Sequence, residues 1–304
     1  MFYQLKDKYR RLRFQFACQF MLKTKPAIVA KNSDTALFTQ LQHKDVLLAL
    51  IALKSFSARV PVGSFHILND GSLTSEDITL LGEHFPNVTF HSMDAARSNY
   101  CPTGGTWERL LTIAELVNEN YVIQLDSDTL TLANLPDVID CIKSNKSFVI
   151  GTWDNQDFEP MSQRQALAYK IVSNFIGQSH IQITAESNFD KLKRFSDLQY
   201  VRGCSGFSGF GKRSFDRGFI DEISGQMFDA LGNRWREWGS EQVMSNIVIA
   251  NTKDRYVLPH PKYCDCTKIK KTETVFLHFI GSCRFSGGIY ARLVRDMASE
   301  LGWR

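Results

Sequence analysis

The sequence predicts an α/β protein of three layers, α/β/α, with a mostly parallel central sheet. From about Pro26, short apolar runs of strand length alternate with segments whose apolar residues recur at helical spacing. This alternation is typical of parallel sheets that are covered by helices on both faces. The chain has 304 residues, of which 43% are hydrophobic and 22% charged, enough for one substantial core. We therefore expect a single domain over residues 26–304, preceded by a helix over residues 1–25.

The N-terminal segment is expected to form a basic amphipathic helix. Apolar residues recur every three or four positions, as on one side of a helix, at Phe2, Leu5, Tyr9, Leu12, Phe16 and Phe20. Basic residues fill much of the remaining surface, at Lys6, Lys8, Arg10, Arg11 and Arg13. The ordinary interpretation is a helix packed on its own domain with a solvated basic face. The alternative is peripheral contact of residues 1–22 with an anionic membrane surface.

Strands and helices alternate through the first half of the chain. Thr74 and Asp77 have the spacing of a capping box, so one helix should begin at Thr74. Asn69-Asp70-Gly71, just before it, is a strong turn signal. The other segments follow from hydrophobic periodicity, with strands at 27–30, 62–68, 88–92, 121–125 and 147–151 and helices at 43–56, 74–84 and 106–118.

The second half is less regular. A loop-rich stretch leads to the Gly-rich segment 203–211, for which a plain turn is one interpretation. Helices are expected at 163–175, 214–231 and 240–250, the last with Ser240 as its N-cap, and strands at 256–258 and 274–279. Neither a repeat nor a low-complexity linker marks a boundary, which favours the single domain.

Composition excludes several classes of protein. The net charge is +4, from 36 basic and 32 acidic residues, too small a bias for a nucleic-acid-binding protein. The longest apolar run, residues 46–53, is far shorter than the roughly 20 residues that cross a bilayer. The N-terminus does not resemble a signal peptide, and the seven cysteines lack zinc-finger spacing. Cys264 and Cys266 are therefore expected to be reduced bystander thiols in a cytoplasmic protein.

Two aspartates follow the apolar run 121–125. Asp126 and Asp128 would lie beyond the carboxyl end of a buried strand, where open α/β sheets bind ligands. Their like charges, close together, favour a divalent cation between them, and such a cation can hold a diphosphate. Aspartates at this spacing also occur by chance, so the site needs support from the rest of the chain. No Gly-rich dinucleotide fingerprint and no P-loop offers another phosphate site.

A second polar cluster lies in the run Phe276–Phe285. His278 falls within an apolar strand, and Gly281 and Arg284 follow at intervals of three residues. An imidazole can complete a carboxylate metal site, glycine lets the backbone approach a phosphate, and arginine suits phosphate oxygens. Taken alone, a histidine such as His278 is more often a core residue whose ring nitrogens are hydrogen-bonded. A role for Gly281 in a simple turn is as plausible as a role at a phosphate.

Together these two motifs resemble the GT-A nucleotide-sugar glycosyltransferases, and most closely the family of glycogenin and the bacterial lipopolysaccharide galactosyltransferases. That family carries Asp-x-Asp and a late His-x-x-Gly-x-x-Lys motif, usually followed by Pro-Trp. Here Arg284-Phe285 stands where Lys-Pro would be expected. The resemblance implies that Asp128 and His278 chelate Mn²⁺ or Mg²⁺, and that Asp126 contacts both the metal and the ribose. It also implies that Gly281 and Arg284 hold the diphosphate.

The family uses further residues around the donor sugar, and their counterparts in this chain are Arg109, Ser208, Gly209, Glu241 and Gln242. The match is looser for them, because Phe207 replaces the family's asparagine before Ser208. Each also has an ordinary structural explanation, such as a solvated charge at Arg109 or a polar first turn at Glu241, where an acidic residue favours the helix dipole. The acidic residue and tyrosine that the family shows after its first strand are not found in Lys31-Asn32-Ser33-Asp34.

The resemblance implies a metal-dependent glycosyltransferase. It would move a hexose, with retention, from a nucleotide-diphosphate sugar (expected to be a UDP-hexose) to a glycan or glycolipid hydroxyl. One alternative is a haloacid-dehalogenase-like phosphatase, which also has strand-Asp-x-Asp. That motif places Thr or Val four residues after the first aspartate, where this chain has Leu130. The other alternative is a nucleotide-sugar-binding protein without turnover, for which the Arg284-Phe285 ending leaves room.

Overall fold

The computed structural model describes the backbone of residues 2–303 and the side chains of residues 6–281 and 283–303. By its internal contacts the chain forms two compact units. The first unit comprises Met1–Ser92, Ile123–Ile139 and His260–Arg304, and the second comprises Met93–Val122 and Asp140–Pro259.

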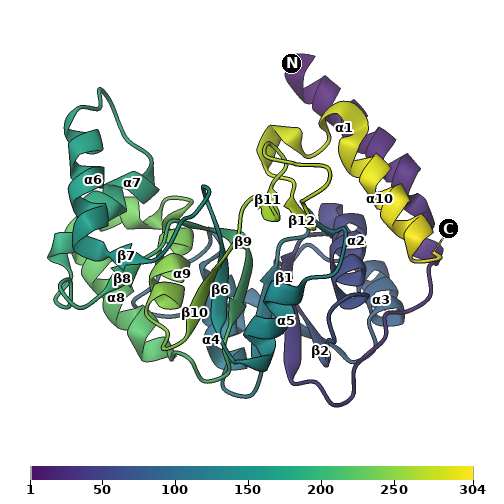
Figure 1. The fold of residues 1–304 in the computed structure, drawn as a ribbon, viewed down its shortest axis with the longest axis horizontal. Coiled ribbons are helices and arrows are strands. Elements are labelled where there is room, and N and C mark those ends of the chain that lie inside the picture. The colour runs from purple at the N-terminus through teal and green to yellow at the C-terminus, as the bar shows by residue number, and fades with distance from the viewer. Residues whose placement is uncertain (1, 304) are drawn as a thin grey trace. The chain divides into compact units, whose positions relative to one another are not determined.

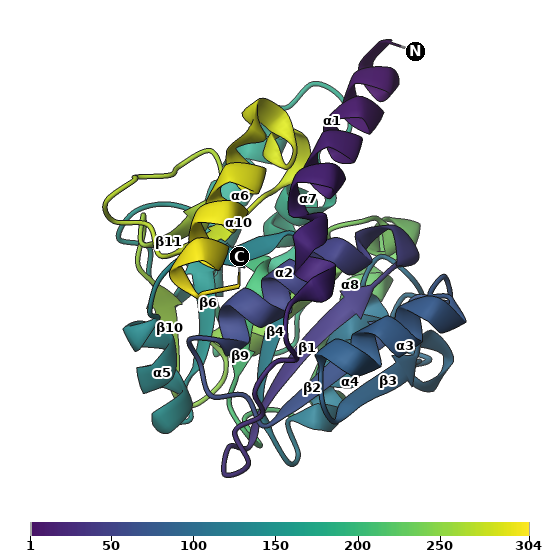
Figure 2. The same cartoon turned by 90° about the vertical axis from the view of Figure 1, so that its right-hand side faces the viewer.

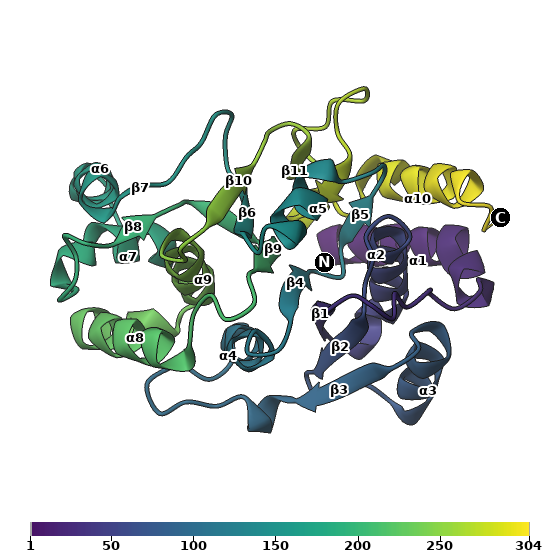
Figure 3. The same cartoon turned by 60° about the horizontal axis from the view of Figure 1, so that its bottom comes forward.

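The first unit contains a parallel sheet and a smaller mixed sheet. Its elements are α1 (Phe2–Cys18), β1 (Thr35–Leu41), α2 (Val46–Ser57), β2 (Ser64–Asn69), α3 (Ser75–His84), β3 (Val88–Ser92), β5 (Thr129–Thr131), β11 (Tyr263–Asp265), β12 (Phe276–His278) and α10 (Ile289–Glu300). Strands β1, β2 and β3 pair in parallel, and α2 and α3 connect them (Figure 3). In the smaller sheet, β12 pairs in parallel with β11 and antiparallel with β5.

The described part of the second unit contains three strands of the main sheet, a separate pair of short strands and several helices. Its elements are α4 (Trp107–Leu116), β6 (Ser147–Gly151), β7 (Glu159–Pro160), α6 (Met161–Ser173), α7 (Ile181–Ser187), β8 (Gln199–Tyr200), β9 (Gly203–Phe210), α8 (Arg217–Leu231), α9 (Ser240–Ala250) and β10 (Arg255–Leu258). Strand β6 pairs in parallel with β10 and antiparallel with β9. A Cβ atom on Gly209 would lie 2.2 Å from the Phe148 ring, so this part of the Gly-rich segment is a strand packed too closely for a side chain.

Two further elements, β4 (Tyr121–Leu125) and α5 (Pro136–Lys143), have residues in both units. Hydrogen bonds order seven strands as β10-β6-β9-β4-β1-β2-β3, and helices alternate with these strands along the chain (Figure 1). The α/β class with a mostly parallel central sheet is therefore confirmed.

Most predicted elements are present within a few residues of their expected bounds. The Thr74–Asp77 capping box is formed, and the strand that leads to Asp126 is buried at all five positions. The strand expected at 27–30 is wrong, because this segment has no strand pairing and Ile28 is 85% exposed. The first strand is β1, which was not predicted, because Thr39 and Gln40 interrupt its apolar residues and leave neither a continuous apolar run nor an alternation.

The N-cap of helix α9 lies one residue before the predicted cap, Ser240. Gly239, with a φ of 105°, is the N-cap, and Ser240 is the first helical residue. The Ser240 hydroxyl oxygen instead accepts a hydrogen bond of 2.9 Å from the indole nitrogen of Trp107. The expected serine cap is therefore corrected to a glycine cap. The Ser240 hydroxyl instead accepts the hydrogen bond of the buried Trp107 indole.

Helix α1 is present, but it packs with a different side from the one expected. The buried side chains are Phe14 and Cys18, whereas Tyr9, Leu12 and Phe16 are 61%, 55% and 77% exposed. The predicted contribution of Phe2 and Leu5 to that apolar side lies outside the described side chains. Figure 2 shows α1 running beside α10. Among the residues described, none of the helices combines the length and apolar character needed to cross a bilayer.

The expectation of a reduced thiol at residue 266 is also corrected. A disulfide joins Cys266 to Cys283, whose Cα atoms are 6.4 Å apart. The two residues follow the paired strands β11 and β12, so the sheet brings them together. Their separation of 17 residues matches no motif, which is why sequence reasoning missed the pair.

Two histidines give the first unit a predictable sensitivity to acid. His66 on β2 and His91 on β3 lie 3.0 Å apart through ring nitrogens, and burial followed by the His91 charge lowers the pKa of His66 from 6.5 to about 4. Below pH 6.5 the His66 imidazole binds a proton in the unfolded state but stays neutral in the folded state. The free energy of unfolding therefore falls as the pH drops toward 4. We expect a loss of about 2 kcal/mol between pH 7 and pH 5.

Urea unfolding at both pH values measures this loss. The variant His66→Gln should reduce the pH dependence markedly, because it removes the group with the most depressed pKa. An unchanged pH dependence in His66→Gln would contradict the assignment to this pair.

Candidate active site

The two aspartates lie in a turn that the surrounding strands hold in place. Strand β4 ends at Leu125 and β5 begins at Thr129, so residues 126–128 form the turn between them. The Thr129 hydroxyl donates to the backbone oxygen of Asp126 at 2.8 Å and closes this turn. Strand β12 lies antiparallel to β5 and places His278 opposite Thr129. This pairing brings together side chains that are 150 residues apart in the sequence.

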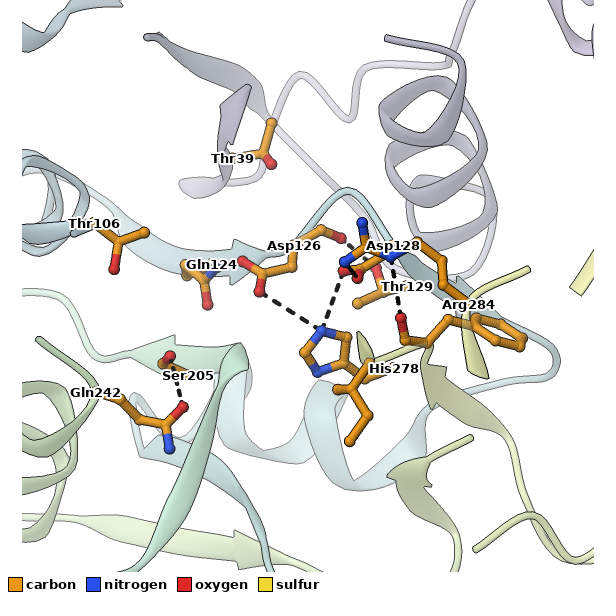
Figure 4. A network of polar contacts seen from close by, with 12 residues as sticks. Thr39, Thr106, Gln124, Asp126, Asp128, Thr129, Ser205, Gln242, His278 and Arg284 are labelled. Atoms are coloured by element: carbon orange, nitrogen blue, oxygen red, sulfur yellow. Dashed lines mark hydrogen bonds and ion pairs between the residues drawn. The ribbon is translucent and has the colours of Figure 1, made fainter. Parts of the chain in front are cut away.

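Asp126, Asp128 and His278 form a compact group of potential ligands within the first unit (Figure 4). One ligand atom from each lies within 4.8 Å of the others. The His278 Nε2 atom is 3.1 Å from Asp128 Oδ1 and 3.6 Å from Asp126 Oδ2. Asp128 and His278 are only 4% and 7% exposed, whereas Asp126 is half-buried. The group therefore has a closed inner side and one partly accessible carboxylate.

Arg284 lies against the same group. Its guanidinium forms an ion pair with Asp128 Oδ2 and donates to the backbone oxygen of Phe279 at 3.3 Å. Burial by itself would raise the pKa of Asp128, but the His278 and Arg284 charges and the His278 hydrogen bond outweigh it and lower that pKa. Asp128 is therefore ionised at neutral pH. The guanidinium supplies positive charge at the carboxylate where a cation would also bind.

The donor set fits a divalent cation. Two carboxylates and one imidazole suit Mn²⁺, and carboxylate oxygens suit Mg²⁺. The Gln124 amide donates to Asp126 Oδ1 at 2.8 Å, which fixes the orientation of that carboxylate and leaves its other oxygen toward His278. Gly281 opens the short 3₁₀ helix η6 (Gly281–Cys283) with a φ of 46°, a conformation that favours glycine.

A second polar group belongs to the second unit. The Arg109 guanidinium forms a buried ion pair with Glu241 at 2.6 Å and donates to the Ser205 hydroxyl at 3.0 Å. Glu241 also accepts from the Thr106 hydroxyl at 3.0 Å. The half-buried Gln242 accepts from Ser205 at 3.3 Å (Figure 4). The structure thus brings together three residues that the sequence placed near the donor sugar, Arg109, Glu241 and Gln242.

The other predicted residues of this region lie further along β9. Ser208 is buried and paired in register with Val149 of β6, and Gly209 packs against Phe148.

Sequence reasoning missed Thr106, Ser205 and Gln124, all of which contact predicted site residues. Only their nearness in sequence to Asp126, Arg109 and Ser208 offered a signal. The role of each residue at the donor sugar stays a prediction.

Comparison with known proteins gives matches in structure alone. No protein-family model matches the chain, and no curated protein matches its sequence. The bifunctional glycosyltransferase WbbM is 12% identical over 90% of this chain, with a TM-score of 0.49, and this chain spans 53% of its length. An active-site mutant of LgtC is 11% identical, with 87% of this chain and 95% of LgtC covered and a TM-score of 0.50.

A second LgtC structure is described as a galactosyltransferase in complex with donor and acceptor sugar analogues. It is 12% identical, with the same 87% and 95% coverage and a TM-score of 0.44. The LgtC comparison at a TM-score of 0.50, together with the strand order, gives the fold. The chain has the GT-A fold and resembles LgtC.

Proposed function

We propose that this protein is a metal-dependent glycosyltransferase that moves a hexose from a nucleotide-diphosphate sugar, preferably a UDP-hexose, to a glycan or glycolipid hydroxyl. The observation that carries the proposal is the group of Asp126, Asp128 and His278, with Arg284 beside it, on a GT-A fold. These residues come from two distant segments, one matching the family's Asp-x-Asp motif and the other its late motif except that Arg284 replaces lysine. A fold alone does not establish an activity, so the site carries the argument.

In the proposed reaction the bond between the anomeric carbon and the diphosphate oxygen breaks. A bond from the acceptor oxygen to that carbon forms. The departing diphosphate oxygen keeps the electron pair of the broken bond and takes the proton of the acceptor hydroxyl. A divalent cation held by Asp126, Asp128 and His278 would neutralise charge on the departing diphosphate. Arg284 would add a guanidinium that can bind two diphosphate oxygens at once. Retention at the anomeric carbon rests on the family resemblance.

Arg284 must exchange partners in this proposal. It forms an ion pair with Asp128 in the structure. When a cation binds the Asp128 carboxylate, the Arg284 guanidinium would instead bind the diphosphate. The variant Arg284→Gln should therefore bind Mn²⁺ about fivefold more tightly, because a partly exposed pair worth ~1 kcal/mol no longer competes. The same variant should bind the donor roughly tenfold to a hundredfold more weakly. Calorimetry with Mn²⁺ alone and then with donor separates the two effects, and equal weakening of both would contradict the exchange.

Nucleotide release from UDP-, GDP- and CMP-sugars, with Mn²⁺ present or with EDTA, tests the function directly. Metal-dependent hydrolysis of one donor supports the transferase. Release of phosphate from phosphatase substrates would instead support the haloacid-dehalogenase-like alternative. Mn²⁺ and donor binding without hydrolysis would support a nucleotide-sugar-binding protein.

We also propose peripheral contact with a membrane through residues 1–22, which suits an anionic glycolipid acceptor. The exposed row of Tyr9, Leu12 and Phe16 on α1 supports this contact. Because these three side chains are more than half exposed, the ordinary interpretation of the amphipathic helix does not account for them.

A further inference from the structure

The two sides of helix α1 have different surroundings. Phe14 packs against the ring of Tyr290 at 4.6 Å between centroids, and the Arg11 guanidinium pairs with Asp45. These contacts fix one side of α1 against the first unit. At 3.6 residues per turn, Tyr9, Leu12 and Phe16 fall on the opposite side. An attached helix therefore presents three large apolar side chains to its surroundings.

A cavity of about 320 Å³ lies between α1 and the start of α10. Arg10 and Arg13 of α1 and Arg295 of α10 line it, and Phe14 and Tyr290 contribute aromatic surface. Helix α10 has Gly288 as its N-cap, without a side-chain hydrogen bond, and its first turn has no acidic residue. The cavity thus combines three guanidinium groups with the positive end of a twelve-residue helix.

Within the described part of the chain, these three arginines have no acidic partner. Arg11, Arg59 and Arg284 each pair with a carboxylate, but no carboxylate of the described residues pairs with Arg10, Arg13 or Arg295. Arg10 and Arg295 are half-buried, so their charges are only partly solvated. The Arg13 guanidinium lies over the exposed Tyr9 ring at 5.8 Å, which places this charge at the edge of the apolar row. An anion in the cavity would compensate all three charges.

We infer that this cavity binds the phosphate headgroup of an anionic phospholipid while Tyr9, Leu12 and Phe16 enter the membrane interface. Charge complementarity selects the headgroup. The apolar row, which Arg13 links to the cavity through its contact with Tyr9, selects a lipid surface over a free anion. Lys6 and Lys8, both exposed, extend the basic surface along the same helix. This inference rests on the membrane contact proposed above and is independent of sugar transfer.

Sedimentation of the full chain with lipid vesicles, without donor or metal, tests the inference. Binding should be strong to vesicles containing phosphatidylglycerol and weak to phosphatidylcholine alone. Each basic residue at an anionic surface contributes about fivefold, so the triple variant Arg10→Gln, Arg13→Gln and Arg295→Gln should bind roughly a hundredfold more weakly. The matched control removes three exposed charges elsewhere, Lys143→Gln, Lys170→Gln and Lys253→Gln, and should bind within about twofold of the parent chain.

A second variant tests the apolar row separately. Leu12→Gln with Phe16→Gln replaces exposed side chains, so it should fold normally while vesicle binding falls at least about tenfold. Equal weakening by the two triple variants would overturn the defined site in favour of general charge attraction. Binding of inorganic phosphate in calorimetry, without vesicle binding, would assign the cavity to a soluble anion instead. If the protein hydrolyses its donor but does not bind vesicles, this inference is overturned while the proposed transferase activity is retained.

Discussion

The variant Asp128→Asn is expected to lose Mn²⁺ binding and to transfer sugar at least about a hundredfold more slowly than the parent chain. The substitution keeps the shape of the side chain but removes the charge that faces both His278 and Arg284. Since Asp128 is 4% exposed, water cannot replace the missing ligand. Calorimetric titration with Mn²⁺ measures the binding loss, and initial rates with the active donor measure the loss of transfer.

The matched control for this variant is Asp140→Asn on the exposed surface of α5. It removes the same charge away from the ligand group and should retain Mn²⁺ binding and rate within about twofold. A thermal melt of Asp128→Asn shows whether the variant is folded. A folded Asp128→Asn protein with full Mn²⁺-dependent transfer would contradict the metal assignment, and with it the mechanism proposed above.

The ligand group could be predicted from sequence because each half has a local signal. A buried strand that ends at Asp126 and an apolar strand that contains His278 are both visible as apolar runs. What the sequence could not show is the antiparallel pairing of β12 with β5, since that depends on tertiary contacts between short strands. The family resemblance supplied that connection. The ion pair of Arg284 with Asp128 had no sequence signal either, because a motif fixes spacing but not the partner that a long side chain chooses.

The errors in the fold have two different physical causes. Strand β1 gave no periodic signal, because polar Thr39 and Gln40 interrupt its apolar residues. Helix α1 exposes its periodic apolar side. There, hydrophobic periodicity was taken to report which side packs on the same chain, yet periodicity reports only that apolar residues share a side. Capping is more predictable when it is local, as at Thr74, than when a tertiary partner competes for the side chain, as Trp107 does for Ser240.

The variant Arg109→Met is expected to lower the free energy of unfolding by about 3–5 kcal/mol. It would leave the Glu241 carboxylate buried without its guanidinium partner, with only the Thr106 hydroxyl among the contacts described above still donating to it. Urea unfolding gives the loss, and Arg213→Met provides the control. Arg213 pairs with Glu119 at 3.7 Å in the same unit, but both side chains are more than two-thirds exposed. Breaking that exposed pair should cost about 1 kcal/mol or less.

The double variant Arg109→Met with Glu241→Met separates a structural role from a functional one. Replacing both charges removes the unpaired carboxylate, so most of the stability lost in Arg109→Met should return. If the sequence-based role of Arg109 and Glu241 near the donor sugar holds, this folded protein remains unable to transfer sugar while Mn²⁺ binding is retained. Transfer at the parent rate by the folded double variant would contradict that role and leave the pair as a buried support for α4 and α9.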